Sequence, residues 1–119
     1  ADSVSSVVRE VNSTERAKYH LAAVFANNFS NAMYTVAEDY LAKQNLEMKY
    51  LLPIIQETAA RLKNDVPSKW QTGPAKRGDK SIMEKHKPKL DDTQLEAMYN
   101  VISEYLIKRH RPQGNQTRE

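Results

Sequence analysis

The sequence contains no cysteine, which excludes disulfide frameworks, thiol catalysis and zinc–thiolate sites. It also has no run near the roughly 18 consecutive apolar residues that a membrane span requires. Its first residues lack the basic and then apolar pattern of a signal peptide. From these absences we expect a cytoplasmic protein that does not interact with a membrane.

Glycine is scarce, with three residues, and no stretch alternates apolar and polar residues as a half-buried β-strand would. The expected fold class is therefore all-α. The chain has 119 residues, of which 39% are hydrophobic and 28% are charged. This composition is typical of a soluble globular domain with one hydrophobic core.

The net charge of +3 arises at the end of the chain, where four basic residues of the last twelve face one acidic residue. The first 107 residues hold 14 basic and 14 acidic residues. Within them, the stretch from Arg61 to Lys89 is locally basic, with nine basic and three acidic residues. A nucleic-acid binder would show a broader positive excess and a recognition helix after a tight turn. Nucleic-acid binding is therefore the least favoured function.

The longest expected element is a helix from Ser13 to Gln44, which begins with a capping-box signature formed by Asn12 and Glu15. It would be about 48 Å long, whereas a compact domain of this size is about 35 Å across. The helix therefore overhangs its own domain, and we expect a second subunit or domain to cover its apolar stripe. The stripe consists of Ala17, Leu21, Val24, Phe25, Phe29, Ala32, Met33, Val36, Tyr40 and Leu41.

The remaining elements are shorter. We expect a weak helical segment over residues 2–10, a second helix over 47–65 that is kinked or divided by Pro53, and a Pro/Gly loop over 66–78. Asp79 can cap a short helix that ends before Pro88, and Asp91 and Asp92 begin the last helix, which reaches Arg109. The predicted organisation is a leading segment over 1–11, a helical domain over 12–109 and a disordered polar tail over 110–119.

The first candidate site is a group of amide side chains in the long helix. Asn27, Asn28 and Asn31 interrupt the apolar pattern, and α-helical spacing places two of them on one face with His20. Tyr34 and Glu38 continue that face. Buried amides need partners, which hydrogen bonds between helices or a ligand pocket would provide. His20 is a candidate acid–base residue, and an exposed or structural histidine is the simpler alternative.

The second candidate site is the loop WQTGPAKRGD, Trp70 to Asp79. Arg77 can bind a carboxylate or phosphate through two hydrogen bonds, and the backbone amides near Asp79 would favour an anion. The alternative is a structural loop with solvated charges. The other residues proposed to face a substrate or cofactor are Gln71, Thr72, Gly73 and Asp79. No metal is expected, because the three histidines lack carboxylates at ligand spacing.

Three blocks of this sequence resemble a known family: YHLAAVFANNFSNAMYTVAEDYL, LLPIIQETAARL and QTGPAKRGD. They are similar to the helical C-terminal domain of Rossmann-like NAD(P)-dependent oxidoreductases, which are relatives of deazaflavin-dependent NADP oxidoreductase. The resemblance implies a domain built on one long central helix, of the type found at the C-terminus of 6-phosphogluconate dehydrogenase. It also implies a homodimer formed through the long helix.

In that family a Rossmann domain precedes the helical domain, and nothing in this sequence has its glycine fingerprint. The resemblance therefore implies that residues 1–11 trail from a missing N-terminal domain. It implies NADP(H) or NAD(H) and a small-molecule substrate for the full-length protein, with no cofactor bound by this chain alone. The amides of the long helix and Arg77 would face that site.

A more distant similarity links AAVFANN to β-hydroxyacid dehydrogenases, in which a catalytic Lys precedes an Asn by four residues. Asn28 matches the Asn, but Val24 stands where the Lys is expected. The usual proton-transfer group is therefore absent, and His20 is the candidate that could replace it. The alternative function is a helical interaction or scaffold module without redox activity.

Overall fold

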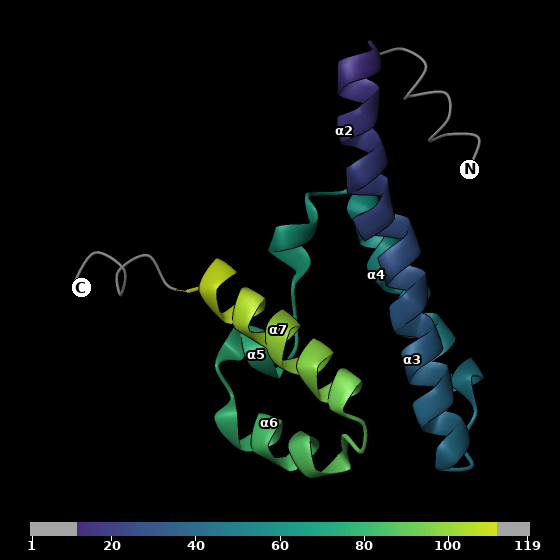
Figure 1. Ribbon diagram of the computed structural model, residues 1–119, viewed down its shortest axis with the longest axis vertical. Helices are drawn as coiled ribbons and strands as arrows, with labels where there is room; N and C mark the ends of the chain where they lie inside the picture. Colours follow the sequence, from purple (N-terminus) through teal and green to yellow (C-terminus); the bar gives the residue numbers. More distant parts are fainter. Residues whose placement is uncertain (1–11, 112–119) are drawn as a thin grey trace, which may run out of the picture. The chain divides into compact units, whose positions relative to one another are not determined.

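The computed structural model describes residues 12–111, and within this range the chain forms helices and no β-strand (Figure 1). The predicted all-α class is therefore confirmed for the described residues. The chain divides into two units, Ala1–Gln56 and Glu57–Glu119, and each is described separately below. The predicted leading segment and the tail beyond Arg111 lie outside the described residues.

The first unit is dominated by the predicted long helix. It consists of α2 (Ser13–Ala23), a π-helical segment η1 (Val24–Phe29) and α3 (Ser30–Lys43), which follow one another without a break (Figure 1). The predicted capping box is present. The Asn12 side chain accepts from the backbone N–H of Glu15 at 2.8 Å, and the Glu15 carboxylate accepts from the backbone N–H of Asn12 at 3.3 Å.

The π-helical segment changes which residues share a face. Its hydrogen bonds join residues five apart, so each residue turns the chain by less than the roughly 100° of an α-helix. The α-helical spacing that placed His20 in line with Asn27 and Asn31 crosses this segment, so that part of the prediction is wrong. Asn31, Tyr34 and Glu38 keep their common face because all three lie within α3.

The long helix ends through a left-handed residue. Asn45 has a φ of 59°, and the chain closes with hydrogen bonds from Asn45 N to Ala42 O at 3.1 Å and from Leu46 N to Leu41 O at 2.9 Å. This pair of bonds is a Schellman motif, which satisfies carbonyl groups of the last helical turn.

The predicted second helix is divided near Pro53, as expected. The 3₁₀ turn η2 (Met48–Leu51) precedes α4 (Leu52–Ala60), in which Pro53 occupies the second position, and the 3₁₀ turn η3 (Arg61–Lys63) follows. Proline is tolerated there because the first N–H groups of a helix have no intrahelical acceptor.

The second unit contains the remaining helices. They are η4 (Pro67–Trp70), α5 (Pro74–Arg77), α6 (Lys80–His86), η5 (Lys87–Lys89) and α7 (Thr93–Arg109). Asp79 caps α6 and Asp92 caps α7, as predicted. The expected loop differs, since it contains η4 and the single turn α5, which starts at a proline and ends at Gly78, with a φ of 69°. Proline at the start and a left-handed glycine at the end favour such a turn.

Packing in the second unit is centred on α5, which contacts both α6 and α7. Ala75 and Met83 are the two buried side chains of the described residues. His86 Nδ1 lies 2.7 Å from the Tyr99 hydroxyl, and the two rings meet edge to face, so this pair joins α6 to α7. We expected one ordinary hydrophobic core. Instead, most large apolar side chains of the long helix are exposed.

Candidate functional site

The first group of predicted site residues lies on the π-helical turn. Asn27 and Asn28 belong to η1, and Asn31 lies in the first turn of α3. All three side chains are exposed, and within residues 12–111 no hydrogen bond to their amide groups is present. Within the described residues, therefore, no neighbouring helix supplies a hydrogen-bond partner for these amides. Isolated π turns in α-helices occur frequently at functional sites, which fits the position of these amides.

His20 lies on α2, one turn before η1, and its ring is exposed. Within the described residues it has no carboxylate partner. A general base usually needs a second group that orients it, and the described residues place no carboxylate at His20 for this purpose.

The second group of predicted site residues lies around two left-handed glycines. Gly73 has a φ of 103° and precedes α5, whereas Gly78 follows it. The side-chain amide of Gln71 donates to the carbonyl oxygen of Thr72 at 3.1 Å, which stiffens the approach to Gly73. At these φ values a side chain with Cβ is strained, so the two glycines fix the direction in which the loop enters and leaves α5.

Asp79 is a structural residue of this loop. Its carboxylate accepts from Ile82 N at 3.3 Å and from the Ser81 hydroxyl at 3.2 Å. The bond from Ile82 N is the main cause that holds the pKa of Asp79 below its ordinary value of 3.8. Ser81 and Arg77 lower that pKa further, and desolvation acts in the opposite direction. Asp79 therefore accepts from one of the backbone amides that we expected to favour an anion, that of Ile82.

Arg77 remains available for a ligand. Its guanidinium Nη2 lies 3.6 Å from Asp79 Oδ2, and its side chain is exposed. That distance orients the guanidinium with a weak ion pair and leaves its other donors free to bind a carboxylate or phosphate. Of the predicted loop residues, the structure brings Arg77 and Asp79 into contact.

The contact between Arg61 and Trp70, the first residue of this loop, was not predicted. The Arg61 guanidinium lies over the Trp70 ring, 5.4 Å from its centroid, and its Nη2 bonds Glu57 Oε1 at 2.6 Å. The Trp70 indole N–H is buried and has no hydrogen-bond partner within the structure. No sequence rule links an Arg on one element to a Trp on another, so this contact carried no signal.

The basic stretch from Arg61 to Lys89 is partly neutralised. Four ion pairs join its cations to nearby carboxylates: Arg61–Glu57, Lys69–Asp65, Arg77–Asp79 and Lys87–Glu84. In the part of the chain that the structure describes, no group of three or more His, Asp or Glu side chains could hold a metal ion. No helix in that part has the length and apolar character needed to cross a membrane.

These residues can bind and orient a ligand. Exposed amides donate and accept hydrogen bonds, and an exposed guanidinium binds an anionic group.

The family described as "Domain of unknown function (DUF2520)" matches residues 1–106. The crystal structure of a putative NADP oxidoreductase from Bacteroides fragilis is similar, with 37% sequence identity and a TM-score of 0.79 over 82% of this chain. This chain spans 38% of the length of that protein. No curated protein matches the sequence.

Proposed function

The chain belongs to the DUF2520 family, and we propose that it is the dimerisation and substrate-side domain of an NAD(P)-dependent oxidoreductase. The observation that carries this proposal is the similarity to the Bacteroides fragilis protein, which extends over 82% of the chain at 37% identity. In this proposal the domain has the fold type of the C-terminal domain of 6-phosphogluconate dehydrogenase. A Rossmann domain elsewhere in the full-length protein would hold the cofactor.

In this proposal the bound nicotinamide supplies the hydride chemistry, and the helical domain supplies orientation and selectivity. The amides of Asn27 and Asn28 suit a neutral group that both donates and accepts hydrogen bonds, such as a carboxamide or carbonyl. Arg77, oriented by Asp79, suits a carboxylate or phosphate of the small-molecule substrate. Gln71, Thr72 and Gly73 shape the backbone beside it.

The direct test is binding of NADPH to the full-length protein. We expect saturable binding by isothermal titration calorimetry, with an affinity that Arg77→Ala leaves unchanged, because Arg77 is assigned to the substrate. A folded full-length protein that binds neither NADPH nor NADH would contradict the proposal.

His20 is the proposed replacement for the proton-transfer group that is lost with Val24 at the expected Lys position. His20→Ala in the full-length enzyme should lower kcat by about 10²-fold or more, the usual contribution of a general acid or base. His110→Ala is the matched control, since His110 lies just beyond the last helix. Unchanged turnover in His20→Ala would remove His20 from the mechanism without affecting the cofactor proposal.

The second candidate is an interaction module without redox activity, and Val24 in place of the expected Lys is the observation that favours it. A stable full-length dimer that binds no nicotinamide would support this alternative. The proposed dimer forms through the long helix, and sedimentation of the full-length protein would detect it.

A further inference from the structure

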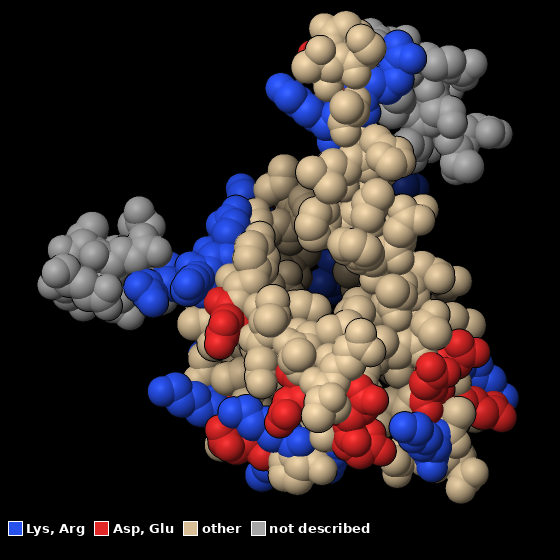
Figure 2. Space-filling view, in the orientation of Figure 1, with Lys and Arg blue, Asp and Glu red and all other residues tan. Residues whose placement is uncertain are grey.

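The middle of the long helix is free of charge. From Tyr19 to Ala37 there are 19 consecutive residues without Asp, Glu, Lys or Arg. Figure 2 shows uncharged side chains along the middle of this helix, with charged ones towards its two ends. Charged residues are depleted in the cores of protein interfaces, so this region has the composition of a surface that another chain covers.

Large apolar side chains project from the same region. Leu21, Phe25 and Phe29 are 61%, 62% and 50% exposed, and Met33 and Tyr40 are 36% and 39% exposed. Successive members from Leu21 to Met33 are four residues apart. A step of four turns an α-helix about 40° beyond one full turn, so three such steps would carry the row about 120° around the helix.

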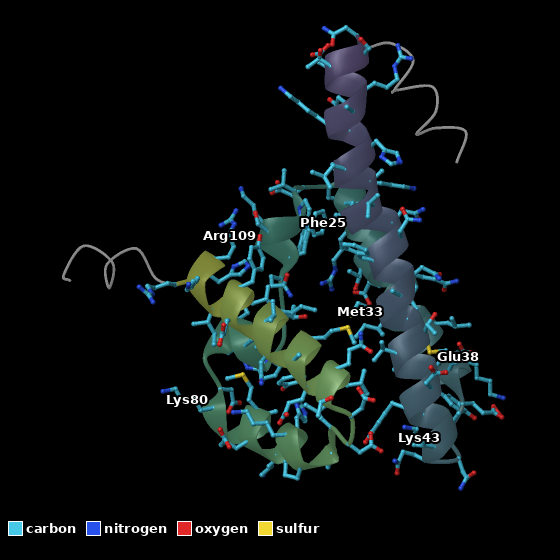
Figure 3. All side chains as sticks on the ribbon, in the orientation of Figure 1. Phe25, Met33, Glu38, Lys43, Lys80 and Arg109 are labelled. Carbon is cyan, nitrogen blue, oxygen red and sulfur yellow. The ribbon has the colours of Figure 1, made fainter. Side chains whose placement is uncertain are left out.

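The π-helical segment removes most of this drift. A π turn needs about one more residue than an α-helical turn to complete the same rotation. The residues after it are therefore rotated back by about 100° relative to a continuous α-helix. η1 lies between Leu21 and Met33, where the correction is needed. The rings of Phe25 and Phe29 meet edge to face with centroids 5.2 Å apart. Figure 3 shows Phe25 and Met33 projecting to the same side of the helix, with Glu38 on the other.

We propose that η1 is a register device that aligns Leu21, Phe25, Phe29, Met33 and Tyr40 in one straight row, which packs against the same row of a second copy. This inference rests on the proposed dimer and adds the reason for its geometry. Two copies related by a two-fold axis need a single self-complementary surface, and a straight row provides one.

The exposed area fits this occupant. Five large side chains with between one third and two thirds of their surface exposed present on the order of 500 Å². A stable interface buries about 800 Å² on each partner, so the row supplies most of one half and its neighbours on the helix supply the remainder.

A one-residue deletion and a one-residue insertion in the long helix should have opposite effects on the dimer. Deletion of Ala26 from η1 allows the segment to close as an α-helix, and the flanking apolar residues then keep their alignment. An alanine inserted between Ala32 and Met33 turns Met33 and Tyr40 about 100° away from the row. The deletion should therefore preserve the dimer, and the insertion should break it.

The test is sedimentation equilibrium of the full-length protein, with helix content followed by circular dichroism. We expect a dimer for the wild type, a dimer dissociation constant within about threefold for the deletion, and at least tenfold weaker association for the insertion. Equal weakening by deletion and insertion would overturn the register proposal, as would an insertion without effect. A monomeric wild type would refute the dimer itself.

If the insertion variant fails to fold, two single substitutions test the apolar row in its place. Phe25→Asp places a charge within the row and should weaken association at least tenfold. Tyr34→Asp is the matched control, because Tyr34 is also aromatic and exposed but lies on the face of Asn31 and Glu38. If the two substitutions weakened association equally, the assignment of the interface to this row would be contradicted. NADPH binding by the wild type, measured separately, tests the oxidoreductase proposal whatever the outcome here.

Discussion

Individual residues fix the places where the helices of this chain begin and end. Asn45 adopts a left-handed conformation after α3, and Gly78 does the same after α5. Asp79 and Asp92 accept backbone N–H groups at the starts of α6 and α7. Each of these effects depends on neighbours within a few positions in the sequence, so each can be tested by a single substitution.

Asn45→Gly should raise the free energy of unfolding by about 0.5 kcal/mol, because glycine adopts a φ of 59° without a Cβ clash. Asn45→Ala should lower it by about 1 kcal/mol. Urea denaturation followed by circular dichroism measures both. Gln44→Gly is the control, since Gln44 has a φ of −95° and glycine there offers no relief of strain. Stabilisation by Gln44→Gly as large as that by Asn45→Gly would contradict the assignment.

Asp79 should contribute to the pH dependence of stability. Its pKa in the folded chain lies below the ordinary 3.8, chiefly because Ile82 N donates to it. The charged form therefore stabilises the fold above about pH 4, and this contribution is lost as the pH falls through the lowered pKa.

We expect the melting temperature of Asp79→Ser to lie below that of the wild type at pH 7, and the gap to narrow as the pH falls below 4. Serine keeps an acceptor for the helix start but carries no charge, so the comparison isolates the carboxylate. A gap that stays constant across this range would show that the charge of Asp79 does not contribute.

At the scale of elements, caps and breaks could be predicted and the internal geometry of the long helix could not. The capping box at Asn12 and Glu15 and the division near Pro53 follow from local hydrogen bonding and from the missing proline N–H. The π turn was not predicted, because an α-helical period was assumed throughout. The repeated four-residue spacing from Leu21 to Met33 was the available signal.

The start of α7 offers a test of a predicted cap. Asp92 accepts from Gln94 N at 2.8 Å and from Leu95 N at 3.0 Å. Asp92→Ala should lower the free energy of unfolding by about 1 kcal/mol, whereas Asp92→Asn, which retains an acceptor, should be nearly neutral. Thermal unfolding of the two variants measures the difference. Equal destabilisation would mean that the charge, and not the capping bond, is the important property.

At the scale of the whole molecule, the described residues present exposed amides, an exposed guanidinium and an apolar row. The chain spans 38% of the length of the similar Bacteroides fragilis protein, which leaves the greater part of such a protein outside it. We therefore expect the 119-residue chain by itself to show no saturable NADPH binding at micromolar concentrations, while the full-length protein binds.

Trp70, the only tryptophan of the chain, reports on this prediction through its fluorescence. Titration of the isolated chain with NADPH should leave the emission unchanged after correction for absorbance. A saturable decrease would contradict the expected division of labour and would place a nicotinamide site within the helical domain itself.

The all-α class of the described residues, several helix ends and the similarity to an oxidoreductase domain could be predicted from the sequence alone, because these depend on composition, on contacts a few residues apart and on ordered motifs. The contacts between elements, such as His86 with Tyr99 and Arg61 with Trp70, became visible only in the folded chain. The same is true of the bond from Ile82 N to Asp79 and of the π turn in the long helix. These outcomes depend on competition between alternative partners or hydrogen-bond spacings, which only the folded chain resolves.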